Sequence, residues 1–154
     1  HKFVHCEDTE KFHVLLQFLN SVKGQRGIVF CRTRNTAKKV ASQLIAKNVA
    51  ADAIHGDLLQ KERDKVMRAF KNENLSIIVA TDIAARGIDV ADLTFVVHFQ
   101  LPDQDEYYTH RSGRTARAGK EGISLVLANG YDVRTIRKYE KNLKISFSQI
   151  KSVK

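Results

Sequence analysis

The sequence lacks the features that mark membrane and secreted proteins. No apolar run comes near the ~18 residues that a membrane-spanning helix needs. The first residues, HKFVHCEDTEKF, contain no apolar core of a signal peptide. The chain has a single proline, with 43% hydrophobic and 28% charged residues, which is typical of a folded globular domain. We therefore expect a cytoplasmic protein with no membrane partner.

Cysteine is also scarce. The only two, Cys6 and Cys31, are not spaced as metal ligands. We favour buried free thiols in a reducing compartment, and a disulfide between the two stays open at this point. His5, His13 and His98 have no partner at metal-ligand spacing either. We therefore predict no metal site, and we expect these histidines at the surface or in packing positions.

A complete catalytic site is missing as well. No Ser/His/Asp or Cys/His set stands at a recognisable spacing, and no cluster of carboxylates would hold Mg²⁺. The glycine-rich phosphate loop G-x-x-x-x-G-K-[ST] is absent. The sequence therefore does not predict a self-sufficient hydrolase or phosphoryl-transfer enzyme.

Positive charge is what the sequence has in excess. Lysine and arginine number 26 against 17 acidic residues, which gives a formal net charge of +9. Such an excess favours a polyanionic partner such as nucleic acid, although many basic proteins are simply basic. The length of 154 residues predicts one domain covering 1–154, and the initial His1 predicts that the chain is a piece of a longer protein.

Helical and strand patterns alternate along the chain. We predict helices near 12–19, 35–48 (capped by Asn35 and Asn48), 59–70 and 131–143, and strands at 27–31, 51–55, 76–81, 94–99 and 122–128. This alternation predicts an α/β fold in three layers, with a mostly parallel sheet and helices on both faces. Ligands bind such sheets at the edge formed by the carboxyl ends of the strands. Three polar clusters each follow a strand and should therefore converge at that edge: TRN (33–35), HGD (55–57) and TDIAARGID (81–89).

The stretch HRSGRTARAG at 110–119 concentrates positive charge among small residues. If 105–117 is helical, His110, Arg114 and Arg117 stand at i, i+4 and i+7 on one face. A charged stripe packed against a neighbour needs water or an anion. The planar, permanently charged fork of arginine suits phosphate. A solvated basic face is the alternative, but Gly113, Ala116 and the location at the sheet edge favour an anion site.

The cluster TDIAARGID also suits a phosphate or sugar ligand. Thr81 and Asp82 can cap a short helix, whose free N–H groups attract phosphate. Gly87 permits a close approach of the backbone, and Asp89 can accept a hydrogen bond from a ribose hydroxyl. The alternative is an ordinary helix cap, a turn glycine and a solvated carboxylate.

The stretch HGDLLQKER at 55–63 offers a weaker signal of the same kind. Gly56 lies on a tight loop, and Gln60 and Arg63 share one helix face. These groups can grip a sugar–phosphate backbone. The alternative is a helix start with a surface glutamine and arginine.

The order of these clusters resembles the C-terminal RecA-like domain of the DEAD-box RNA helicases. IVFCRTR (28–34) is similar to motif IV of that family, HGDLLQKER to its Q-x-x-R element, VATDIAARGID (79–89) to motif V and HRSGRTARAG to motif VI. The resemblance extends from about Phe3 to Leu143. The family's usual motif VI reads H-R-I-G-R-T-G-R, and Ser112 and Ala116 stand here in place of the Ile and the second Gly.

The resemblance implies roles in ATP hydrolysis. Arg114 and Arg117 would be arginine fingers that reach the γ-phosphate of ATP held by a partner domain. His110 would link the ATP site to that domain. Gly87 and Asp89 would line the nucleotide, with Asp89 on the ribose.

The resemblance also implies contacts with RNA. Backbone contacts would come from Thr33, Gly56, Gln60, Arg63 and Thr81. Asp82 would support this set by pairing with Arg63, and Arg111 would have a structural role. None of the contacting residues is aromatic, so binding is expected to be independent of sequence.

What the chain lacks then defines its part in the reaction. The phosphate loop and the Asp-Glu-Ala-Asp motif belong to the N-terminal RecA-like domain of this family. The resemblance therefore implies half of an ATPase: ATP with Mg²⁺ is held mainly by that other domain, the partner is single-stranded RNA or a short RNA duplex, the protein is a monomer, and this chain alone is inactive. The alternatives are an RNA-binding module with a degenerate ATPase site, a domain of a DNA helicase, and a scaffold that binds a regulator.

Overall fold

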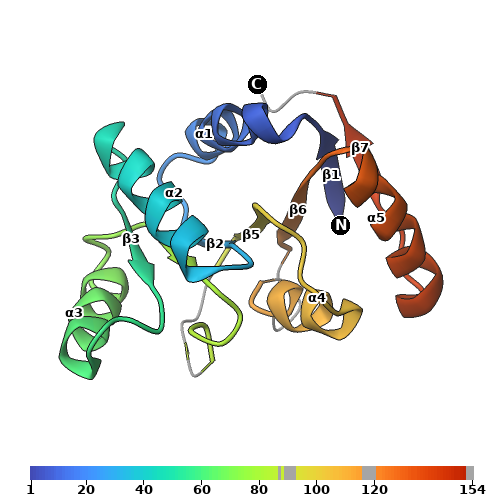
Figure 1. Ribbon diagram of the computed structural model, residues 1–154. Helices are drawn as coiled ribbons and strands as arrows, with labels where there is room; N and C mark the ends of the chain where they lie inside the picture. Colours follow the sequence, from blue (N-terminus) through green and yellow to red (C-terminus); the bar gives the residue numbers. More distant parts are fainter. Residues whose placement is uncertain (87, 89–92, 116–120, 152–154) are drawn as a thin grey trace.

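The fold is known from a computed structural model that describes residues 1–86, 88, 93–115 and 121–151. Helices and strands alternate along most of the chain (Figure 1). The strands are β1 (Lys2–His5), β2 (Gly27–Phe30), β3 (Ala51–Ile54), β4 (Ile77–Ala80), β5 (Phe95–His98), β6 (Ile123–Ala128) and β7 (Ser148–Ile150). The helices are the 3₁₀ helix η1 (Asp8–Glu10), α1 (Lys11–Ser21), α2 (Arg34–Ala46), α3 (Gln60–Lys71), α4 (Asp105–Ser112) and α5 (Gly130–Leu143).

The described strands form one parallel sheet in the order β3-β4-β2-β5-β6-β1-β7. Every residue of β2, β4 and β5 is buried. Their sequences GIVF, IIVA and FVVH are almost wholly apolar because both faces of a parallel sheet are covered. The predicted α/β architecture is confirmed.

Helices cover both faces of the sheet, which makes three layers (Figure 1). Alternate strand residues point to opposite faces. Val29 and Val79 face α1 and α2, and together they form one core cluster. Ile28 and Ile78 face the other side, where α3 packs on them. On that same side α4 and α5 pack over β6 and β1 around Tyr108.

Several element boundaries differ from those predicted. Strands β1 and β7 were not predicted. The N-cap of α2 is Thr33, whose Oγ1 accepts a hydrogen bond from the Thr36 N–H, and not Asn35. Asn48 does follow the end of this helix with a φ of 62°, the left-handed conformation expected after a helix terminus.

Helix α4 is shorter than the predicted 105–117. It ends at Ser112, and Gly113 forms its C-cap. Beyond it the chain turns, and the Thr115 hydroxyl donates a buried hydrogen bond to the Leu93 carbonyl at 2.7 Å. The short helix predicted after Thr81 is instead a turn, closed by the Ala85 N–H on the Thr81 carbonyl.

Both cysteines are buried free thiols, as predicted. Burial raises the pKa of the Cys31 thiol to about 12, which keeps it protonated and unreactive. Among the residues that the structure describes, no helix has both the length and the apolar character needed to cross a membrane.

Candidate functional site

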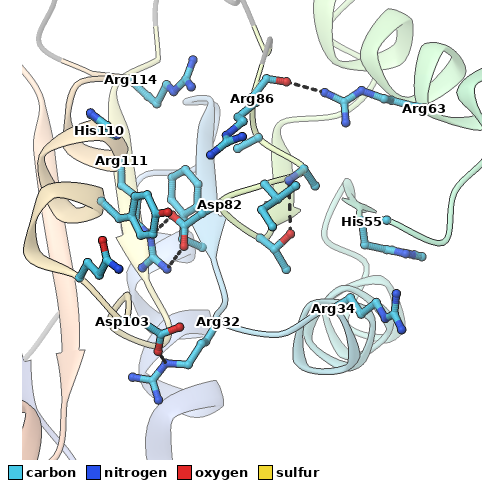
Figure 2. Close-up of a pocket in the computed structure, with 18 residues that line it drawn as sticks. Arg32, Arg34, His55, Arg63, Asp82, Arg86, Asp103, His110, Arg111 and Arg114 are labelled. Carbon is cyan, nitrogen blue, oxygen red and sulfur yellow. Dashed lines mark hydrogen bonds and ion pairs between the residues drawn. The ribbon is translucent and has the colours of Figure 1, made fainter.

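A pocket of about 740 Å³ opens at the carboxyl edge of the sheet. Its walls come from the segments that directly follow β2, β3, β4 and β5, together with parts of α3 and α4. The predicted convergence of the three polar clusters on one edge is therefore confirmed. Figure 2 shows arginine and histidine side chains from these separate elements gathered around the same space.

The pocket is strongly cationic. Six arginines line it, against two aspartates: Arg32, Arg34, Arg63, Arg86, Arg111 and Arg114. Both aspartates are already paired. Asp82 binds Arg111, and Asp103 lies 3.3 Å from Arg32 Nε. The arginines that remain give the pocket the charge and the donor groups that a phosphorylated ligand requires.

A third aspartate lies beside the pocket and is also neutralised. Asp57 contacts Lys38 Nζ at 2.8 Å and Arg34 Nη1 at 3.2 Å. The hydrogen bond from Lys38, with smaller contributions from Arg34 and His55, lowers the pKa of this carboxyl. It therefore stays ionised and holds the start of α2 against the loop after β3.

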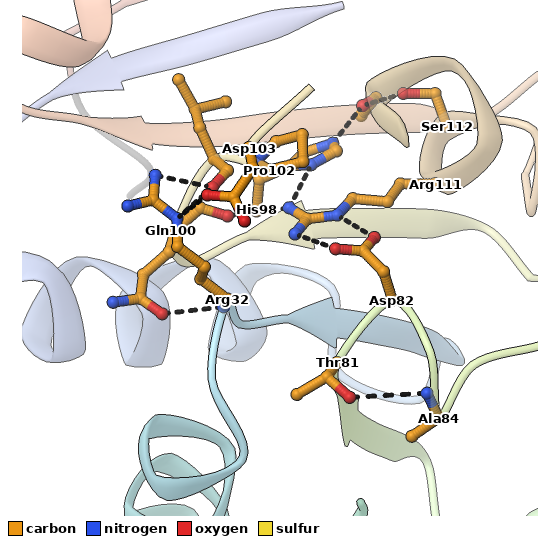
Figure 3. A network of polar contacts seen from close by, with 12 residues as sticks. Arg32, Thr81, Asp82, Ala84, His98, Gln100, Pro102, Asp103, Arg111 and Ser112 are labelled. Atoms are coloured by element: carbon orange, nitrogen blue, oxygen red, sulfur yellow. Dashed lines mark hydrogen bonds and ion pairs between the residues drawn. The ribbon is translucent and has the colours of Figure 1, made fainter. Parts of the chain in front are cut away.

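Arg111 holds one wall of the pocket in place through buried contacts with neighbouring elements (Figure 3). Its side chain is fully buried, and Nε and Nη2 donate to the two carboxylate oxygens of Asp82 at 2.6 and 2.8 Å. Nη1 donates to the Gln100 carbonyl at 2.7 Å, and the guanidinium lies over the Phe30 ring. Arg111 thus ties α4 to the turn after β4 and to the end of β5, as its predicted structural role implies.

The predicted pairing of Asp82 with Arg63 is wrong. Both oxygens of Asp82 are taken by the bidentate contact with Arg111, which has no other carboxylate partner among the described residues. Arg63 instead donates from Nη2 to the Arg86 carbonyl at 2.8 Å. It therefore ties α3 to the backbone of the turn after β4.

A buried polar network lies behind Arg111. The His98 ring is fully buried on β5, with Nδ1 3.3 Å from Arg111 Nη1 and Nε2 2.8 Å from Ser124 Oγ. Because arginine can only donate, Nδ1 accepts, and the ring proton sits on Nε2 and is donated to Ser124. The Tyr108 and Ser112 hydroxyls also contact Ser124 Oγ, at 3.0 and 2.9 Å. Ser112, which departs from the family pattern, is therefore accommodated by a hydrogen bond.

Burial controls the charge of His98. Desolvation, and to a lesser degree the Arg111 cation, lowers the pKa of His98 well below its ordinary value of 6.5. The ring is therefore neutral near neutral pH. No sequence motif indicates this network. His98 alone is typical of a packing residue, and its partners Arg111 and Ser124 lie 13 and 26 positions away.

Six of the predicted site residues line the pocket: Gly56, Arg63, Thr81, Asp82, His110 and Arg114. His110 lies exposed near the end of α4, with its ring tilted by 49° to that of Tyr107 and 6.3 Å between the ring centroids. Arg114 lies beyond that helix, and its Nη1 donates to the Ile88 carbonyl at 2.9 Å. The two residues share the pocket, although they do not form the helical stripe that the sequence predicted.

Two predicted residues, Thr33 and Gln60, do not line this pocket. Thr33 Oγ1 caps α2, and Gln60 Nε2 donates to Asp64 on the exposed side of α3. Gly87, Asp89 and Arg117 fall outside the described residues, so their predicted roles stay predictions.

Sequence reasoning passed over three arginines of the pocket: Arg32, Arg34 and Arg86. The signal was available, because Arg34 and Arg86 lie within two of the clusters that follow strands, and Arg32 stands directly before the first of these clusters. Because ligands bind at the carboxyl edge of a parallel sheet, every cation close after a strand is a candidate for the site, and these three arginines qualify.

Divalent metal ions do not fit the described residues of this pocket. Asp82 and Asp103 are engaged by arginines, and no group of three or more His, Cys, Asp or Glu side chains in the described part of the chain stands as a metal site.

Comparisons with known proteins relate the chain to helicases. The family described as helicase conserved C-terminal domain matches residues 10–119. An ATP-dependent RNA helicase of Limosilactobacillus reuteri, CshA, is 37% identical over 149 residues, which are 97% of this chain but only 30% of that protein.

Solved structures of similar fold come from proteins of the same kind. A DEAD box protein from the hyperthermophile Methanococcus jannaschii is 40% identical with a TM-score of 0.90, over 97% of this chain and 41% of that one. S. cerevisiae Dbp5 bound to RNA and ADP BeF3 is 25% identical with a TM-score of 0.91, over 98% of this chain and 41% of that one.

Proposed function

Because the chain belongs to the helicase conserved C-terminal domain family and is the RecA-like C-terminal helicase domain of a DEAD-box protein, we propose that it supplies one half of an ATP-driven RNA helicase. The other half is an N-terminal RecA-like domain that holds most of the ATP with its Mg²⁺. The observation that carries the proposal is the pocket at the sheet edge, whose arginines outnumber its already paired aspartates.

In this proposal Arg114 acts on the nucleotide. Its Nη1 contact with the Ile88 carbonyl fixes the side chain, while its other N–H groups have no partner among the described residues. A guanidinium held in this way stabilises the negative charge that develops on the transferred γ-phosphoryl group. Arg117 is proposed as the second finger, His110 as the link to the N-terminal domain, and Gly87 and Asp89 as nucleotide contacts.

RNA is proposed to lie on the other half of the pocket. Gly56, Arg63 and Thr81 line this part and offer a backbone N–H, a guanidinium and a hydroxyl to phosphate oxygens. Thr33 and Gln60 extend the contact outside it. Asp82 acts indirectly, because Arg111 occupies its carboxylate and so holds the turn that carries Thr81. The similar Dbp5 structure with RNA and ADP BeF3 supports this assignment.

Closure of the two domains couples the proposed ATP contacts to the proposed RNA contacts. ATP and single-stranded RNA bind across the cleft between the domains, and the strand is bent as the cleft closes. A short duplex thereby loses its second strand locally. Hydrolysis and release of phosphate reopen the cleft.

Replacing Arg114 in the intact protein tests the proposal. We expect Arg114→Ala to lower the RNA-stimulated kcat of ATP hydrolysis by about 10³-fold or more, because an arginine finger contributes at least that much. RNA affinity should stay near that of the wild type. Arg68→Ala is the matched control, since Arg68 is an exposed arginine on α3 outside the pocket.

Two outcomes would favour the alternatives. Unchanged ATP hydrolysis in the Arg114→Ala protein would indicate an RNA-binding module with a degenerate ATPase site. Equal stimulation of ATP hydrolysis by RNA and by DNA of the same sequence would favour a DNA helicase, because the preference for RNA rests on the family alone.

A further inference from the structure

The exposed face of α5 is a second cationic surface, separate from the pocket. Arg134, Lys138 and Lys141 recur at i, i+4 and i+7, and all three are exposed. Among the described residues, none of the three side chains has an ion-pair or hydrogen-bond partner. Like charges at this spacing slightly destabilise a helix, and an anionic ligand would offset this repulsion.

The acidic residues of α5 do not neutralise this face. Asp132 is buried, where it caps the helix through the Asn129 N–H and lies 3.5 Å from Lys11 Nζ. Glu140 accepts hydrogen bonds from Arg137 and from the Phe147 N–H, both at 2.8 Å. On α3, by contrast, Asp64 stands among the exposed lysines.

A free aromatic ring stands at the first turn of α5. The Tyr131 side chain is 75% exposed and has no partner among the described residues. Tyr131 lies at i−3 from Arg134 and i−7 from Lys138, on the same side of the helix. Its position just after β6 places it at the carboxyl edge of the sheet, the edge that carries the pocket.

A smaller cavity lies between the pocket and the Tyr131 ring. Tyr131 lines this cavity of about 330 Å³, which is also lined by Arg32. Arg32 lines the main pocket as well. A strand that leaves the pocket past Arg32 can therefore reach the Tyr131 ring, and the three cations follow Tyr131 along α5.

We propose that Tyr131, Arg134, Lys138 and Lys141 form an accessory site for single-stranded RNA, which binds the part of the strand that extends beyond the main pocket. The inference rests on the proposed RNA binding and deepens it. The aromatic ring offers a base a stacking surface that the predicted RNA contacts of the pocket do not provide, and the three cations follow the phosphates. An acidic protein surface would also match the charge of the three cations, but the shared lining residue Arg32, which links Tyr131 to the proposed RNA pocket, favours RNA.

The test compares strands of two lengths on the intact protein by fluorescence anisotropy. We use oligouridine of about 6 and about 16 nucleotides, which lie near the lower and upper limits of the roughly 4–16-nucleotide sites of OB-fold proteins. Tyr131→Ala should weaken binding of the longer strand by about tenfold, the loss expected for one stacked base, and leave the shorter strand unchanged. Tyr131→Phe, which keeps the ring, should bind both strands like the wild type.

Salt dependence tests the cations. The triple variant R134Q/K138Q/K141Q should reduce the slope of log affinity against log salt for the longer strand by about 2, because each phosphate that a cation neutralises contributes about 0.7 to that slope. The control is K23Q/K47Q/K71Q, which removes the same charge from exposed lysines at the opposite edge of the sheet. That control should leave the slope unchanged.

The inference is overturned if Tyr131→Ala and the α5 triple variant bind the longer strand as the wild type does. It is also overturned if they lose affinity for both lengths equally, or if they lose only a protein partner. Failure of the wild type to bind either strand would instead refute the proposed function itself.

Discussion

The ion pair between Arg111 and Asp82 shows how a single buried residue supports the pocket. Arg111 has a fully buried side chain, and Asp82 is its carboxylate partner. Removing one member of such a pair leaves an uncompensated charge in the interior. We therefore expect Asp82→Ala to lower the free energy of unfolding by about 3 kcal/mol in urea titration.

A double variant identifies the cause. In Asp82→Ala/Arg111→Met, the buried cation is gone, so most of the stability should return. If the double variant is as unstable as Asp82→Ala alone, the unpaired Arg111 is not the main cause, and the loss comes from the turn or from the Gln100 carbonyl that Arg111 no longer pairs.

His98 gives the fold a pH dependence that can be measured. Its pKa in the folded protein is well below 6.5, so the unfolded chain binds the proton more readily. Stability from this residue is therefore complete above about pH 6.5 and is lost as the pH falls. From about pH 7.5 to about pH 5.5, the wild type should lose about 1 kcal/mol more than His98→Asn, which cannot ionise. Parallel losses in the two proteins would show that His98 is not held neutral.

At the scale of elements, the start of α2 combines a structural and a functional residue. Thr33 is a proposed RNA contact, and its hydroxyl also accepts the Thr36 N–H at 3.2 Å to cap the helix. Thr33→Ala should lower the free energy of unfolding by about 1 kcal/mol, and Thr33→Ser should restore it. Thermal unfolding checks both values. RNA affinity should be compared between these variants only at temperatures where both remain folded.

The elements also show what a sequence can predict. The runs in β2, β4 and β5 are continuous and apolar, so the residue pattern alone is enough to predict burial on both faces. Strands β1 and β7 were missed because each carries exposed polar residues, whereas β2, β4 and β5 are wholly buried. They are strands because β1 pairs with β6 and β7 pairs with β1, and these contacts join segments far apart in the sequence.

In the site too, local sequence patterns predict some features, while others depend on long-range packing. Gly56 and Thr81 were predicted to meet because each belongs to a cluster that follows a strand, and the pocket brings them together. Arg63, predicted on the helix that follows Gly56, lines the same pocket. The partner of Asp82 was predicted wrongly, because Arg63 and Arg111 are equally plausible from spacing. Only the packing of α4 against the end of β5 decides between them.

At the scale of the whole molecule, the division between two domains sets the activity of this chain. The proposed fingers act only on a phosphate that another domain holds. The purified 154-residue chain should therefore hydrolyse ATP no faster than a buffer blank in a phosphate-release assay, with or without RNA. Robust turnover would contradict the proposed sharing of the site.

Pairing of the carboxylates around the pocket also bears on inhibitor chemistry. Asp57, Asp82 and Asp103 are all engaged by cationic side chains, so a small-molecule cation would have to break an existing pair to bind. Screening libraries rich in amines are thus poorly matched to this surface. Sulfonates, phosphonates and tetrazoles suit Arg63, Arg86 and Arg114, which have no carboxylate partner among the described residues.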